Sequence, residues 1–95
     1  MPTQPVPIAI LPLGAHEQHG PHLPFETDAL IAHEVAQRLC RAAPAGIQTE
    51  LLPAESTGYS IEHMDVSGTR TLGFEEAVNR WIDIAARCAD RGIRR

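Results

Sequence analysis

The residues best suited to chemistry lie in the stretch 14–28, where glycines and prolines surround three histidines and three carboxylates. Glu17 and His19 are two positions apart, so their side chains leave the same face of an extended backbone. Asp28 stands at the start of a predicted helix, where free N–H groups and the helix dipole favour an ionised carboxylate. This mixed nitrogen and oxygen set suits zinc, manganese or iron. Spacing alone leaves a second interpretation open, in which these are solvated loop residues.

Two predicted β-α units would position these side chains. An apolar run at residues 6–13 predicts a strand covered on both faces, whose regular part is shortened by its prolines. A helix is predicted over residues 28–42 and a second strand over residues 47–53. A helix between two strands indicates a crossover connection and a parallel sheet, in the α/β class. Ligands of such sheets gather at the carboxyl ends of the strands, where the stretch 14–28 begins.

Both predicted helices have start signals and apolar faces. Thr27 is the expected N-cap of the first helix. The second helix is predicted over residues 74–91, with Gly73 as its N-cap and Glu76 forming half of a capping box. The stripe predicted to be buried on the first helix comprises Ile31, Val35 and Leu39, with Ala32 and Ala36 beside them. The apolar face of the second comprises Val78, Trp81, Ile82, Ala85, Cys88 and Ala89.

The connection at residues 54–71 has little helical periodicity and carries several polar side chains close together. Connections of this length are often functional. Its polar and aromatic residues are Tyr59, Glu62, His63 and Asp65. One interpretation is a pocket wall that contributes substrate contacts, and the other is a solvated loop whose polar groups bond to their own backbone.

Two sequence blocks resemble motifs of the creatininase family, which are metal-dependent amidohydrolases. Residues 11–24, followed by Thr27 and Asp28, resemble the opening motif, and residues 58–65, followed by Gly68 and Thr69, resemble the next one. The resemblance implies a partial three-layer α/β/α fold with a parallel sheet, of which two β-α units are present. Residues 1–95 would form the N-terminal part of such a domain.

The resemblance also implies a site for two divalent metal ions. By matching positions, Glu17 resembles the ligand of one ion, His19 the ligand of the other, and Asp28 the carboxylate that bridges them. The family often has a small polar residue where His16 stands, so His16 is not counted as a ligand. His22 belongs to the motif and is expected beside the pocket.

The function implied by the resemblance is hydrolysis of a C–N bond in a cyclic or linear small-molecule amide, by a homo-oligomer. His63 is a weak catalytic candidate for moving a proton. A different class of function is a non-catalytic fragment or an assembly module, because the family's later metal ligands, on a Gly-His-Gly-type loop and a glutamate, are not among these 95 residues.

Composition and the cysteines limit the partners and the cellular location expected of the chain. The net charge of −4 gives no electrostatic basis for binding nucleic acid. No apolar run approaches the roughly 20 residues that cross a membrane, and the N-terminus lacks the pattern of a secretory signal. Cys40 and Cys88 are separated within predicted helices, which indicates free thiols and a cytoplasmic protein.

Overall fold

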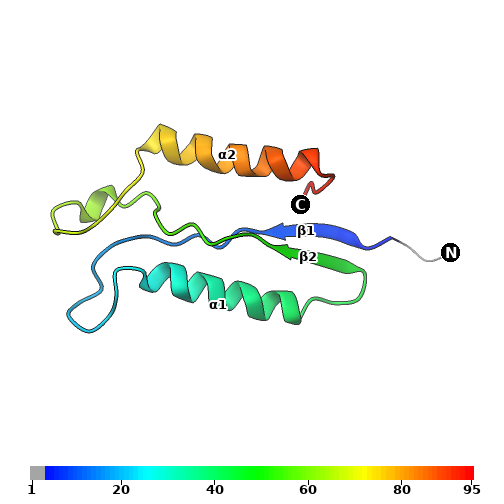
Figure 1. Cartoon of the computed structure of the whole chain (residues 1–95), viewed down its shortest axis with the longest axis horizontal. Coiled ribbons are helices and arrows are strands. Elements are labelled where there is room, and N and C mark those ends of the chain that lie inside the picture. Colours follow the sequence, from blue (N-terminus) through cyan, green and yellow to red (C-terminus); the bar gives the residue numbers. More distant parts are fainter. Residues whose placement is uncertain (1–3) are drawn as a thin grey trace.

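The computed structural model describes residues 4–95, so the first three residues of the predicted domain lie outside the described part. The elements follow the predicted order: β1 (Val6–Ile10), α1 (Thr27–Arg41), β2 (Ile47–Leu51) and α2 (Phe74–Asp90). The two strands pair in parallel. Figure 1 shows α1 on one side of the strands and α2 on the other. The predicted α/β class, with a parallel sheet between helices, is therefore confirmed for this chain.

Strand register determines which residues meet each helix. Ala9 pairs with Glu50, and side chains alternate between the faces of a sheet. Ala9 lines the groove beneath α2, and Glu50 on the same face accepts a hydrogen bond from Arg91 beyond the end of α2 (Nη1 to Oε1, 2.8 Å). Helix α1 contacts β2 from the other side. Helices α1 and α2 therefore cover opposite faces of the sheet.

The chain segments after both strands stay paired beyond the regular sheet. Leu52 N–H donates to Ile10 O (2.9 Å), Glu55 N–H donates to Pro12 O (2.9 Å), and Gly14 N–H donates to Glu55 O (2.8 Å). Pro12 has no N–H group, so it enters this pairing only as an acceptor. The expected short strand is confirmed, and the irregular pairing extends it toward the stretch 14–28.

The helix starts agree with the predictions in position but differ at one cap. Thr27 is the first residue of α1 rather than its N-cap, which is Glu26, and the Thr27 hydroxyl donates to Pro24 O (2.6 Å). That hydroxyl therefore closes the preceding turn. At α2, Gly73 N–H donates to Glu76 Oε1 (3.2 Å), so the predicted half of a capping box is confirmed.

The buried faces of the helices differ from the prediction. On α1 the buried residues are Ala29 and Ala36, because the small side chains let this helix approach the neighbouring backbone closely. Of the stripe predicted to be buried, Ala36 is buried and Ala32 partly covered, whereas its larger residues are more than half exposed: Ile31 58%, Val35 59% and Leu39 56%. On α2, Ala77 and Cys88 are buried, with Trp81 and Ala89 partly covered, whereas Val78, Ile82 and Ala85 are exposed.

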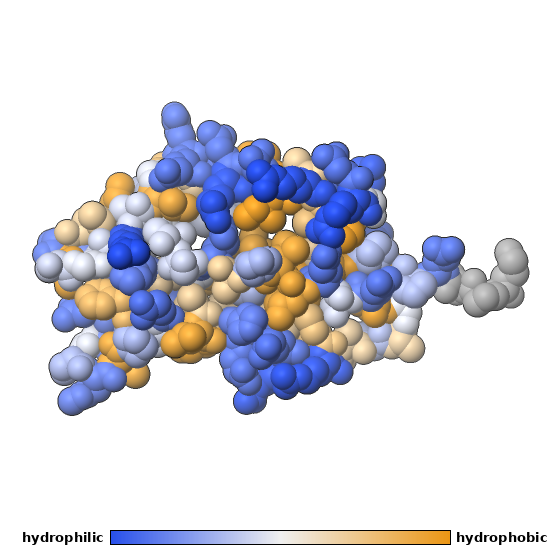
Figure 2. Space-filling model, in the orientation of Figure 1, coloured by the Kyte–Doolittle hydropathy of each residue, from blue (hydrophilic) through white to orange (hydrophobic). Residues whose placement is uncertain are grey.

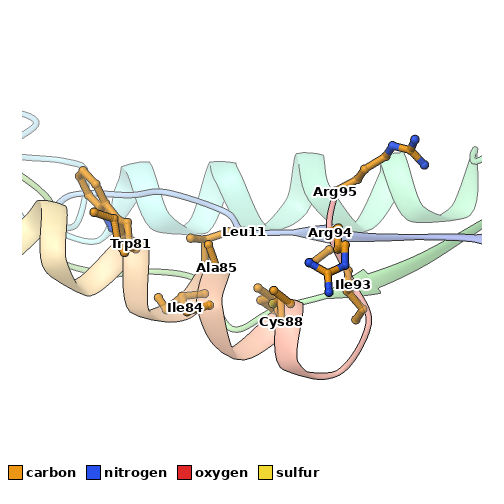
Figure 3. A pocket seen from close by; sticks show the side chains of 13 residues that line it. Leu11, Trp81, Ile84, Ala85, Cys88, Ile93, Arg94 and Arg95 are labelled. Atoms are coloured by element: carbon orange, nitrogen blue, oxygen red, sulfur yellow. The ribbon is translucent and has the colours of Figure 1, made fainter.

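An apolar groove runs between α2 and the chain that follows β1. Figure 2 shows the apolar surface that opens there beside the polar outer side of α2. In Figure 3, Trp81, Ala85 and Cys88 project from α2 toward Leu11 and Ile93. Ala9 N–H donates to Arg95 O (2.8 Å), so the last residue pairs with the edge of β1 that faces away from β2.

The structure also bears on the predictions about the cysteines and about membrane-spanning helices. Both Cys40 and Cys88 are free thiols, as predicted. Within residues 4–95, neither helix has the length and apolar character needed to cross a membrane.

Candidate metal centre

The structure brings Glu17, His19 and Asp28 together, with one ligating atom of each within 4.8 Å of the others. His19 Nε2 lies 3.4 Å from Asp28 Oδ2 and 4.0 Å from Glu17 Oε1. Ligand atoms that bind zinc at about 2.1 Å stand roughly 3.4 Å apart in a tetrahedron. The three side chains therefore lie at separations close to those of a ligand set.

The chemistry of this cluster fits a divalent cation. His19 Nε2 is shielded from solvent and has no hydrogen-bond partner among the described residues. A buried polar atom without a partner is uncommon in folded proteins, and it often indicates a place where an ion binds. Because two carboxylates face this nitrogen, a cation would satisfy the imidazole and reduce the repulsion between the carboxylates.

Local structure explains how the three side chains meet. Glu17 and His19 extend from the chain that leaves β1, and their spacing of two directs both side chains to the same place. Asp28 is the second residue of α1, in the first turn of the helix. Its carboxylate therefore lies where the helix dipole stabilises negative charge.

Close backbone contacts hold the segments that carry these ligands. A Cβ placed on Gly14 would lie 2.5 Å from the Cα of Ala29, and one placed on Gly58 would lie 2.6 Å from Gly14 O. Only glycine permits this approach at either position. The base of the stretch 14–28, the start of α1 and the connection after β2 are therefore packed backbone to backbone.

His63 lies beside the cluster, at the end of the short 3₁₀ turn Ile61–His63 within the predicted connection. Its Nε2 atom is 3.5 Å from Glu17 Oε2 and 3.7 Å from Glu62 Oε1. Its side chain is 47% exposed, compared with 14% for Glu17. His63 thus stands between the candidate ligands and solvent, which is a position from which a proton could be exchanged with water.

Of the other residues singled out in the sequence, Glu62 forms a second group of possible ligating atoms with Glu17 and His63. Tyr59 packs edge-on against Phe74 (ring centroids 6.1 Å apart), and His22 and Asp65 are exposed. Neither His22 nor Asp65 belongs to the groups of ligating atoms found in residues 4–95.

Two features near the site were not predicted from the sequence. Glu55, only 6% exposed, receives two hydrogen bonds from the Arg80 guanidinium of α2, one of them at 2.9 Å. These bonds raise the pKa of Arg80 above its ordinary value. His16 stacks on Phe25, with ring centroids 5.3 Å apart. Both pairs join positions nine or more residues apart, so helical or strand spacing gave no signal of them.

The fold and the site define a class of protein: an α/β chain that gathers an imidazole and two carboxylates where its strands end. Residues 3–95 match the family model described as creatininase, creatinine amidohydrolase, and the chain belongs to the creatininase family. The family predicted from the two sequence blocks is thereby confirmed.

Proteins similar to this chain include several named mycofactocin precursor peptide peptidase. The protein from Mycolicibacterium smegmatis is 41% identical over 70 residues, and that from Mycobacterium tuberculosis strain H37Rv is 43% identical over 75 residues. The protein from Mycobacterium ulcerans is 39% identical over 77 residues. These matches cover 72–73% of this chain but only 28–30% of each relative. No solved structure matches the chain significantly.

Proposed function

We propose that this chain supplies part of the metal centre of an amide hydrolase that cleaves the C–N bond of a peptide substrate. The observation that carries the proposal is the convergence of Glu17 and Asp28 on the Nε2 atom of His19, which is buried and has no hydrogen-bond partner within residues 4–95. Membership of the creatininase family and the peptidase name of the similar proteins support hydrolysis as the reaction.

In this proposal Glu17, His19 and Asp28 hold the metal. Zinc, manganese and iron all fit the donor set. When bound, such an ion supplies Lewis-acid polarisation of the amide carbonyl and an activated water. The family resemblance favours two ions, with Asp28 shared between them. A single ion held by all three residues is the simpler alternative, and the ratio of metal to protein distinguishes the two.

His63 is the proposed residue for moving a proton at the same site. Its Nε2 atom lies close to Glu17 and its ring reaches solvent, so it connects the candidate ligands with bulk water. A His63→Gln variant should bind metal as the unchanged protein does but lose hydrolytic activity, by about 100-fold, the lower range for general acid–base catalysis. Unchanged activity would remove His63 from the mechanism.

A linear peptide is the proposed substrate class, rather than a cyclic amide. The similar proteins are named for a precursor peptide, whereas creatinine appears only in the description of the family model. The connection that carries His63 is exposed at residues 61–65, beside Glu17, where a substrate could reach it. Parallel assays with peptide amides and with creatinine would test this choice, and turnover of creatinine alone would contradict it.

The decisive experiment measures Zn²⁺ or Mn²⁺ binding by calorimetry and metal content by elemental analysis. Glu17→Gln and Asp28→Asn preserve shape but remove a charge, and each should weaken binding by more than about 100-fold, beyond the usual effect of residues outside the ligand set. Glu34→Gln is the matched control, because Glu34 is an exposed carboxylate on α1 paired with Arg38. Equal binding by all variants would refute the centre.

The same experiment addresses the alternative of a metal-free fragment or assembly module. That alternative predicts a folded chain without metal, whose oligomeric state does not depend on Glu17. The hydrolase names among its relatives favour the enzyme. The homo-oligomer stays a prediction, which sedimentation analysis can test. The free thiols of Cys40 and Cys88 support a reducing compartment such as the cytoplasm.

A further inference from the structure

Two stacked rings lie at the base of the stretch that carries the candidate ligands. The ring planes of His16 and Phe25 are 14° apart, with centroids separated by 5.3 Å. The side chain of His16 is only 15% exposed. His16 immediately precedes Glu17, and Phe25 precedes Asp28 by three residues. The stack therefore joins the two chain segments that bring the carboxylates to the site.

Backbone contacts reinforce the stack from both sides. Glu17 N–H donates to Phe25 O (3.2 Å), and Arg70 N–H donates to His16 O (2.8 Å). Gly68 has φ +92, and a Cβ placed there would lie 3.0 Å from Phe25 Cζ. A third segment thus packs on the Phe25 ring, and its fit requires glycine both for the positive φ and for the space.

The His16 ring lies with its flat surface on Phe25. Its Nδ1 atom is 3.9 Å from Oε1 of the exposed Glu26. His16 is absent from the groups of ligating atoms in residues 4–95.

We propose that His16 is a positioning residue, whose stack on Phe25 fixes the separation of Glu17 and Asp28 and so raises metal affinity. The inference rests on the proposed metal centre. The physical basis is preorganisation: ligands on a loose segment lose conformational entropy when they bind an ion, whereas ligands that are already fixed lose little.

The test compares Zn²⁺ affinity in His16→Ala and His16→Phe, measured by competition with a chromogenic chelator. His16→Ala removes the ring and should weaken binding about 10-fold, the lower range for residues that support metal ligands. His16→Phe keeps a flat ring without nitrogens and should stay within about 3-fold of the unchanged chain, because stacking needs only the ring surface. Thermal unfolding of the metal-free proteins reports whether each variant folds.

Two outcomes would overturn the inference. Equal loss in both variants would show that a His16 nitrogen contributes, and unchanged affinity in His16→Ala would show that the stack does not position the ligands. Phe25→Leu is the second variant if His16→Ala fails to fold, and it should lose affinity to a similar degree. Failure of the metal centre itself would appear separately, as Zn²⁺ affinity that does not change in Glu17→Gln.

Discussion

Two regions of the chain contrast in which side chains they cover. The stretch 14–28 covers polar side chains, whereas the outer side of α1 (Thr27–Arg41) exposes apolar ones. In the stretch, the Glu17 side chain is only 14% exposed and that of His19 only 22%. On α1, the apolar Val35 is 59% exposed, and Ile31 and Leu39 are similar. Hydrophobicity alone would predict the reverse. In this chain, close approach of the backbone therefore decides which residues are covered.

The close approach occurs where small residues meet. Gly14 packs against Ala29 at the start of α1, and Ala36 lies two turns further along the same face. A helix that contacts its neighbour through glycine and alanine sits close to it, so larger side chains on adjacent faces point outward. Near this contact the Glu17 and His19 side chains are 14% and 22% exposed, whereas the Asp28 side chain is 37% exposed.

Adding a side chain at Gly14 should lower the unfolding free energy more than the other substitutions below, because it opposes the close approach of the backbones. In Gly14→Ala the new Cβ would meet backbone atoms of Ala29 that cannot move independently of α1, so the variant should lose about 3 kcal/mol of unfolding free energy, at the upper end for overpacking. Urea denaturation measures the loss. Gly73→Ser is the control, since Gly73 has open space around its Cβ position, and equal loss in both variants would contradict the steric explanation.

Enlarging a buried alanine on α1 should have the next largest effect. Ala36 is 5% exposed, so Ala36→Leu forces a larger side chain between the helix and its neighbours and should cost about 2 kcal/mol. The same denaturation experiment measures it. A stabilised variant would show that this face of α1 has room to spare and that close approach does not control burial.

Acidification should have a smaller effect, through the pair that links β2 (Ile47–Leu51) to the end of α2 (Phe74–Asp90). The hydrogen bond from Arg91 holds the pKa of Glu50 below its ordinary value of 4.5. Because the folded pKa is the lower one, this pair stabilises the chain above about pH 4.5, and the contribution is lost as pH falls through the folded pKa. The melting temperature of the unchanged chain should therefore fall more steeply below pH 4.5 than that of Glu50→Gln. If the melting temperatures of the two proteins fell equally with pH, the Glu50–Arg91 pair would not contribute in this way.

The smallest effect is expected on the outer side of α1. Val35→Ser removes an apolar side chain from a position that is already more than half exposed, so the unfolding free energy should change by less than about 0.5 kcal/mol. This variant is the matched control for Ala36→Leu on the same helix. A loss above about 1.5 kcal/mol, which exceeds the usual surface range, would show that Val35 is covered in solution.

The sequence predicted elements more reliably than it predicted contacts between them. Both strands and both helices lie within a few residues of their predicted bounds, because local spacing and capping residues define them. The predicted buried face of α1 was right for Ala36, which is buried, and wrong for the adjacent stripe of larger residues, Ile31, Val35 and Leu39, which is more than half exposed. Periodicity identifies such stripes, but the neighbour that packs on the helix selects between them.

Residue types and short spacings predicted the order of the elements and the parallel sheet, and with the family resemblance they named three candidate ligands, whose role stays a prediction. Three contacts emerged only when the chain was folded: His63 comes within 3.5 Å of Glu17, Arg80 binds the buried Glu55, and His16 stacks on Phe25. Each of these contacts joins separate segments of the chain. Such contacts depend on how separate segments pack, as at Gly14 against Ala29 and Gly58 against Gly14, which no local pattern encodes.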